Sequence, residues 1–180
     1  LDFDKINVIH QSTSKVKIDF KKKKKIISFV GKLNSSKGYD AFGEAILKIL
    51  GTYPNWKSIV IGDEPREKLN FKHKNLNHLG YKDNPYILNK LKEVSISVVP
   101  SKWNEPFGRS SLEAASRGSA LIISNTGGLK ETTNNALIIE NITAKNIYKN
   151  IDYLIKNKKF RQDLQKSAYK NFKLTNQRSS

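Results

Sequence analysis

Short apolar runs alternate along the chain with segments in which apolar residues recur at helical spacing. Five runs are apolar at consecutive positions, as in strands buried on both faces, and they lie at 26–30, 58–62, 95–99, 121–124 and 136–139, whereas a third strand in chain order, at 76–80, is weaker. The helical pattern lies at 38–51, 66–69, 85–94, 108–117, 144–157 and 159–172. Strands that alternate with helices predict an α/β domain with a doubly wound, six-stranded, Rossmann-like parallel sheet.

Length and composition are typical of one globular domain. The 180 residues are 37% hydrophobic and 27% charged, and no apolar run is long enough to span a bilayer. The chain has no cysteine, which excludes disulfides and thiolate zinc sites, and its three histidines lack metal-ligand spacing. We therefore expect a cytoplasmic protein without a metal site.

The formal charge of +17 raises the question of an anionic partner. Most of the excess is lysine, accompanied by much asparagine and isoleucine, which is the bias of an AT-rich genome, whereas nucleic-acid-binding surfaces favour arginine and aromatics. The densest lysine cluster, 21–25, directly precedes a predicted strand. It is either a solvated loop or a patch for an anionic surface, a membrane rather than nucleic acid.

Ligands of a doubly wound sheet bind at the carboxyl ends of the strands. The loop after the first strand carries Lys32 and Lys37 between Gly31 and Gly38, at the start of a predicted helix. Two ammonium groups beside a helix N-terminus favour a pyrophosphate. The spacing matches neither a P-loop nor the GxGxxG of dinucleotide oxidoreductases, and the alternative is that both lysines are merely solvated.

A second loop leads into a predicted helix near Gly108 and holds two carboxylates eight positions apart. Glu105 would lie in the loop and Glu113 on the helix, and carboxylates accept hydrogen bonds from the diols of sugars. The backbone N–H groups of Phe107, Gly108 and Arg109 would face a phosphate at the same helix end. The sequence therefore predicts a second part of the same ligand site.

A third loop, 124–129, has paired glycines, which either admit a ligand close to the backbone or form a plain turn.

Taken together, the motifs along the chain follow in the order F-V-G-K-L…K-G, I-G-D, L-G-Y, V-V-P-S, E-P-F-G-R-S-S-L-E-A, R-G and S-N-T-G-G-L-K-E. In this order, over roughly 26–140 and the closing helices, the chain resembles glycosyltransferase family 4. The resemblance implies the nucleotide-sugar-binding, C-terminal half of a retaining GT-B-fold enzyme.

The resemblance also implies roles for individual residues. Lys37 matches the phosphate-binding lysine of the family, whereas Lys32 stands where arginine is usual, so that the charge is kept and the bidentate fork is lost. Glu105 would contact the transferred sugar and Glu113 the ribose hydroxyls, and the L-G-Y segment would frame the base. Further donor contacts are implied at Gly31, Gly80, Tyr81, Phe107, Gly108 and Arg109.

The resemblance divides the chain into a linker from a missing N-terminal acceptor domain, 1–20, a donor domain, 21–158, and a C-terminal helix and tail, 159–180. It implies a hexosyltransferase that needs no metal and transfers sugar from a nucleotide diphosphate, UDP or GDP, with retention. The acceptor would be a carbohydrate or lipid-linked hydroxyl, as in polysaccharide biosynthesis at the inner membrane face. Without the acceptor domain we expect no turnover.

Two alternatives remain open. Nucleotide-sugar 2-epimerases share this fold, and release of nucleotide diphosphate with a glycoside, rather than an epimerised sugar, would distinguish the transferase. A non-catalytic basic module would bind anions with an affinity that collapses with salt and is insensitive to Glu113→Ala.

Overall fold

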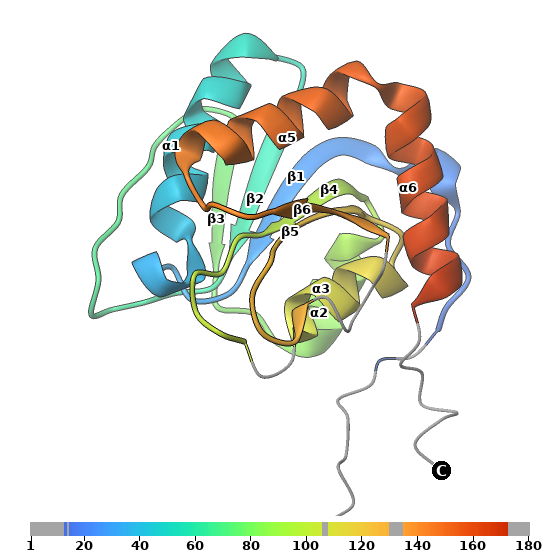
Figure 1. The fold of residues 1–180 in the computed structure, drawn as a ribbon, viewed down its shortest axis with the longest axis horizontal. Helices are drawn as coiled ribbons and strands as arrows, with labels where there is room; N and C mark the ends of the chain where they lie inside the picture. The colour runs from blue at the N-terminus through green and yellow to red at the C-terminus, as the bar shows by residue number, and fades with distance from the viewer. Residues whose placement is uncertain (1–12, 14, 106–107, 130–134, 173–180) are drawn as a thin grey trace, which may run out of the picture.

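The computed structural model describes residues 13, 15–105, 108–129 and 135–172. Its strands are all parallel and form one six-stranded sheet in the order β3-β2-β1-β4-β5-β6, so that the order reverses between β1 and β4 (Figure 1). This is the doubly wound sheet that the alternating pattern predicts. The strands are β1 (Lys24–Val30), β2 (Lys57–Ile61), β3 (Leu76–Gly80), β4 (Val94–Val99), β5 (Ala120–Ser124) and β6 (Ala136–Ile139).

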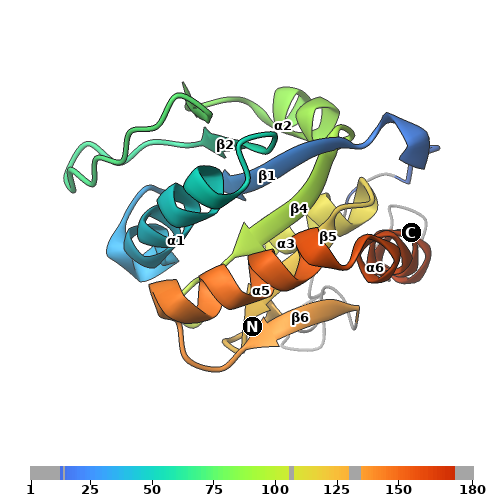
Figure 2. The ribbon, with the colours of Figure 1, turned by 90° about the horizontal axis from the view of Figure 1, so that it is seen from above.

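Helices cover both faces of the sheet, which is why its central strands are apolar at consecutive positions. Ile27 and Phe29 of β1 belong to the core under α1 and α5, whereas Ile26 and Val30 pack into the core under α2, α3 and α6. Figure 2 shows α1 and α5 side by side along one side of the sheet. The helices are α1 (Tyr39–Thr52), α2 (Asn84–Leu91), α3 (Arg109–Ser116), α5 (Ala144–Lys156) and α6 (Lys158–Asn171).

The helix predicted at 66–69 is wrong, because β2 and β3 are joined by an irregular loop, 62–75. A single helical turn is unfavourable without other contacts. Here Glu67 Oε2 instead accepts hydrogen bonds from the backbone N and the Oγ of Ser35, at 2.5 and 3.0 Å. The loop is therefore tied to the turn that follows β1, at the end of the sheet where the ligand is expected.

The sequence offered a solvated loop as one interpretation of the lysine cluster 21–25, and the structure fits this only in part. Its first two lysines end the 3₁₀ turn η2 (Phe20–Lys22), and its last two already belong to β1. Lys23 is partly buried, and its Nζ donates to the carbonyl oxygens of Leu91 and Arg117, at 3.1 and 2.5 Å. These carbonyls stand at the C-terminal ends of α2 and α3, where a cation is stabilising.

The described residues before η2 pack against α6. Tyr169 Oη donates to the carbonyl oxygen of Val16 at 2.5 Å, and the rings of Phe20 and Tyr169 meet edge-on with centroids 5.7 Å apart. Lys15 Nζ lies 5.2 Å from the centroid of the same tyrosine ring. The segment 15–20 is thus held in place by specific contacts with the last helix.

Candidate functional site

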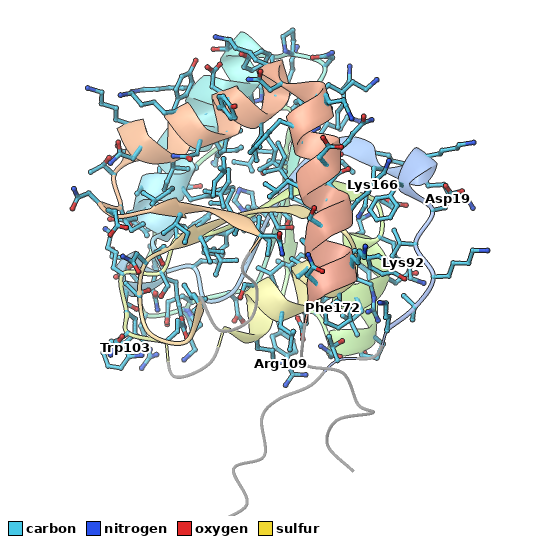
Figure 3. All side chains as sticks on the ribbon, turned by 45° about the vertical axis from the view of Figure 1, so that its right-hand side comes forward. Asp19, Lys92, Trp103, Arg109, Lys166 and Phe172 are labelled. Atoms are coloured by element: carbon cyan, nitrogen blue, oxygen red, sulfur yellow. The ribbon has the colours of Figure 1, made fainter. Side chains whose placement is uncertain are left out.

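The loops at the carboxyl ends of β1 and β4 enclose a cavity of about 160 Å³, beside the point where the strand order reverses. Its polar lining comes from the turn after β1, the loop after β4 and the first turn of α3. Trp103 and Arg109, from that loop and that helix, project from the same end of the molecule (Figure 3). The cavity lies where a doubly wound sheet is expected to bind its ligand.

Lys37 and Glu105 form an ion pair in this cavity, although they lie 68 positions apart in the chain. The side chain of Glu105 is 15% exposed and that of Lys37 31%. Ser101 Oγ donates to the same Glu105 oxygen at 3.0 Å. The structure therefore brings together the lysine and the carboxylate that the resemblance assigns to the phosphates and the sugar.

Two close approaches that favour glycine hold these loops together. At Gly38, with φ 76°, an added Cβ would lie 2.0 Å from the carbonyl oxygen of Pro100, at the end of β4. At Gly127, with φ 49°, it would lie 2.0 Å from the carbonyl oxygen of Glu105, which also accepts a hydrogen bond from Gly128 N at 2.5 Å. The paired glycines of the third loop thus allow a close approach, and the group they approach is the backbone of Glu105.

The N-terminus of α3 meets the cavity without a side-chain cap. Its N-cap residue is Gly108, and Gly108, Arg109 and Gly31 all line the cavity. The first N–H groups of a helix have no partner within the helix, and together with the helix dipole they favour an anion. The predicted contact at Phe107 lies outside the described residues.

A second, more apolar pocket of about 250 Å³ adjoins the first and shares Val30 and Gly31 with it. Lys32 and Tyr81 line this second pocket, and the tyrosine is 75% exposed. Lys32 and Lys37 therefore line neighbouring pockets rather than one. An apolar hollow beside an exposed aromatic ring suits a planar heterocycle.

Glu113 is buried on α3, with 5% of the residue exposed, and does not line either of these two pockets. Its Oε1 accepts hydrogen bonds from Arg109 Nε at 2.8 Å and from Asn84 Nδ2 at 2.5 Å. Arg109 connects it to the first cavity, and Asn84 connects it to the segment that begins with Gly80 and Tyr81. Gly80, which ends β3, also lines neither pocket.

The residue patterns did not identify Ser101 and Asn84 as site residues. Ser101 ends the V-V-P-S motif directly after β4, so its place at a strand end was the available signal. Asn84 is the first residue of α2 and directly follows the cap residue. The structure assigns the cap to Asp83, whose carboxylate accepts a hydrogen bond from the backbone N of Tyr86 at 3.1 Å, and this leaves the amide of Asn84 for Glu113.

Sequence comparison places the chain in a known family. The family model described as glycosyl transferases group 1 matches residues 10–171. An uncharacterized glycosyltransferase of Methanocaldococcus jannaschii is 33% identical over 115 residues, which cover 59% of this chain and 29% of the relative. The chain spans less than a third of the length of such curated relatives.

Solved structures agree with this placement. The C-terminal domain of a group 1 family glycosyl transferase from Francisella tularensis has a TM-score of 0.71 at 28% identity, over 81% of this chain and 82% of that one. A protein of Anabaena, solved in complex with UDP-glucose, has a TM-score of 0.70 at 17% identity, over 82% of this chain and 43% of that one. The chain therefore belongs to the group 1 glycosyl transferases, and its fold is that of a GT-B C-terminal domain.

Proposed function

We propose that this chain is the donor-binding domain of a retaining, family 4 glycosyltransferase, with UDP or GDP as the nucleotide of the donor sugar. The observation that carries the proposal is the ion pair of Lys37 and Glu105 at the uncapped N-terminus of α3. A cation beside a helix N-terminus suits a diphosphate, and a carboxylate beside them suits the hydroxyls of a sugar. The Anabaena protein of the same fold that was solved with UDP-glucose supports a nucleotide sugar.

The two adjoining pockets accommodate different parts of this donor. The diphosphate occupies the first cavity, where Lys37 and the first turn of α3 bind it and Glu105 accepts hydrogen bonds from the sugar. The base lies in the second pocket against Tyr81, and Lys32 approaches the phosphates from there. Glu113 accepts hydrogen bonds from the ribose hydroxyls. For Phe107, which lies outside the described residues, the contact with the phosphates rests on the family resemblance alone.

In the complete enzyme, the hydroxyl of a carbohydrate or lipid-linked acceptor attacks the anomeric carbon of the donor hexose, as in polysaccharide synthesis. A new C–O bond forms, the bond to the nucleotide diphosphate breaks, and the hydroxyl proton passes to the departing phosphate. Lys32, Lys37 and the α3 dipole stabilise the negative charge that develops on the leaving group. Because the acceptor binds to another domain, this chain alone binds donor without turnover.

Isothermal titration with UDP, GDP, ADP and dTDP at physiological salt tests the proposal. One base should be preferred, and Lys37→Ala and Glu113→Ala should each weaken binding by about tenfold or more. Lys48→Ala, which removes an exposed lysine of α1, is the matched control and should leave binding unchanged. Equal, salt-sensitive heat from all four nucleotides, unaltered in the variants, would contradict the donor site and favour the basic anion-binding module.

The lysines at the amino ends of the strands, opposite the pockets, support a second proposal, a peripheral contact with an anionic membrane. Glu93 lies at this edge, where Lys24 and Lys90 approach it at 3.4 and 3.9 Å, so positive charge remains in excess. A lysine near an anionic membrane contributes about 1 kcal/mol to binding. No helix in the described ranges is long and apolar enough to cross a membrane. We define the lysine edge as Lys21, Lys22, Lys23, Lys24, Lys25, Lys57, Lys90 and Lys92, which line two adjacent hollows.

A further inference from the structure

Asn84 joins helix α2 to the buried carboxylate of Glu113. Its Nδ2 lies 2.5 Å from Glu113 Oε1, and because an ionised carboxylate can only accept, the amide is the donor. Asp83 caps α2 through the backbone N of Tyr86, so the amide of Asn84 is not needed at the helix end. The contact with Glu113 is therefore the polar role that the structure shows for this side chain.

The second hydrogen-bond donor to Glu113 is Arg109, which lies on the same helix as the carboxylate. Arg109 Nε lies 2.8 Å from the same Oε1 atom, and the side chains are 56% and 6% exposed for Arg109 and Glu113. Both of these hydrogen bonds fall on Oε1, so the two donors fix the orientation of the carboxylate together. Arg109 belongs to α3, as Glu113 does, whereas Asn84 belongs to α2 and links the carboxylate to the segment that carries Tyr81.

We propose that Asn84 is a positioning residue that orients Glu113 to read the ribose diol, and thereby sets the preference for ribonucleotides over 2′-deoxyribonucleotides. The inference rests on the proposed function, in which Glu113 accepts hydrogen bonds from the ribose. With Oε1 held by Asn84, the carboxylate of Glu113 keeps one orientation. A hydrogen bond from a hydroxyl to a charged acceptor contributes more to the binding free energy than one to water. The 2′-deoxy ligand lacks the hydroxyl that makes this bond.

The test is a thermodynamic cycle between the side chain and the ligand hydroxyl, measured by isothermal titration on the whole chain. The ligands are UDP and 2′-deoxy-UDP, or GDP and 2′-deoxy-GDP, whichever base the chain prefers. The variants are Asn84→Ala and Asn84→Leu, and the matched control is Asn89→Ala, at an exposed asparagine of the same helix. Asn84→Leu keeps the approximate size of the side chain but has no donor, so it remains informative where alanine disturbs α2.

The wild-type chain and Asn89→Ala should bind the ribonucleotide about tenfold or more tightly than the 2′-deoxyribonucleotide. Both Asn84 variants should reduce this ratio to about threefold or less. The reduction should come from weaker binding of the ribonucleotide, with the affinity for the 2′-deoxy ligand unchanged. A residue that only maintained the fold would weaken both ligands alike.

An unchanged ratio in the Asn84 variants overturns the inference, and so does equal weakening of both ligands. A wild-type chain that binds nucleotide but does not distinguish the two sugars also overturns it, because Glu113 then does not read the 2′-hydroxyl. A wild-type chain that binds no nucleoside diphosphate contradicts the proposed function itself. The failure of the proposed function and the failure of this inference are therefore distinguishable.

Discussion

In the first cavity, the carboxylate of Glu105 would compete with a bound diphosphate for the ammonium group of Lys37. The ammonium of Lys37 pairs with the carboxylate of Glu105, which also accepts from Ser101. A diphosphate that approaches Lys37 has to share it with this carboxylate and is repelled by the negative charge. Under the proposed function, Glu105 would therefore favour recognition of the sugar at the expense of affinity for the diphosphate alone.

Glu105→Gln should tighten the binding of UDP or GDP without sugar by about 3–10-fold, because it removes the negative charge beside Lys37 and keeps the side-chain shape. Isothermal titration of the nucleoside diphosphates measures the change. Ser101→Ala, which leaves the charge in place, serves as the control and should not tighten binding. Weaker binding to Glu105→Gln than to wild type would show that the pair binds phosphate as a unit.

Lys23 is a second residue whose charge depends on its surroundings. Burial lowers the pKa of Lys23 to about 7 from its ordinary value of 10.5. Between these values the unfolded chain binds more protons than the folded one, so stability rises with pH by at most about 1.4 kcal/mol per pH unit. Below pH 7 this side chain is charged in both states, and above pH 10.5 it is neutral in both, so its contribution to the slope disappears.

Lys23→Met should remove this rise of stability between pH 7 and 10.5. Urea denaturation at several pH values in that window gives the free energy of unfolding and its slope. Lys22→Met, at the exposed neighbour in η2, should keep the wild-type slope. The same slope in all three proteins would mean that the carbonyl oxygens at the ends of α2 and α3 keep Lys23 fully charged.

At the scale of elements, contacts between loops build the site more than the helices do. The loop after β5 touches the loop after β4 where Gly127 meets the backbone of Glu105, and the loop after β2 is bound to the turn after β1. A substitution in one loop should therefore change the positions of residues in another loop.

Gly127→Ala should lower the free energy of unfolding by about 1–3 kcal/mol and weaken nucleotide binding, because its Cβ would collide with the Glu105 carbonyl at positive φ. Gly51→Ala is the contrasting control. Gly51 lies in α1 with open space around it, so the substitution should raise the free energy of unfolding by about 0.5–1 kcal/mol. Urea denaturation and titration measure both effects. Wild-type affinity in Gly127→Ala would show that the contact does not position Glu105.

The whole molecule has two chemically different ends. The carboxyl ends of the strands hold the two adjoining pockets, and the amino ends carry the lysine edge. Figure 3 shows Lys92, on the lysine edge, on the opposite side of the view from Trp103, in the loop after β4. The proposed membrane contact and the proposed donor site therefore lie on separate parts of the surface.

The chain should co-sediment with vesicles of phosphatidylcholine and phosphatidylglycerol at low salt, and binding should decline as salt screens the charges. Alanine at Lys21, Lys22, Lys25 and Lys92, all on the lysine edge, should abolish it. The matched control replaces four exposed lysines elsewhere with alanine, at Lys48, Lys145, Lys149 and Lys158, and so lowers the net charge equally. Equal loss in both variants would mean that the attraction comes from diffuse charge.

The residue pattern by itself determined the order and type of almost every element, because apolar repeats at strand and helix spacing are local properties of the chain. It therefore identified the sheet, the loops at its carboxyl edge, and Lys32, Lys37, Glu105 and Glu113 as candidates. The one helix that it predicted wrongly, 66–69, is a stretch whose carboxylate binds a distant loop. The local spacing of residues does not predict a contact with a distant loop.

Only the tertiary structure decided which side chains meet. Lys37 pairs with Glu105 and Asn84 with Glu113 across separations of 68 and 29 positions, and Lys23 reaches two helix ends that follow it far along the chain. These distances depend on the strand order and on which helices share a face. A periodic pattern specifies the face on which a residue lies but not its neighbour there, so the pairing became known only from the packed molecule.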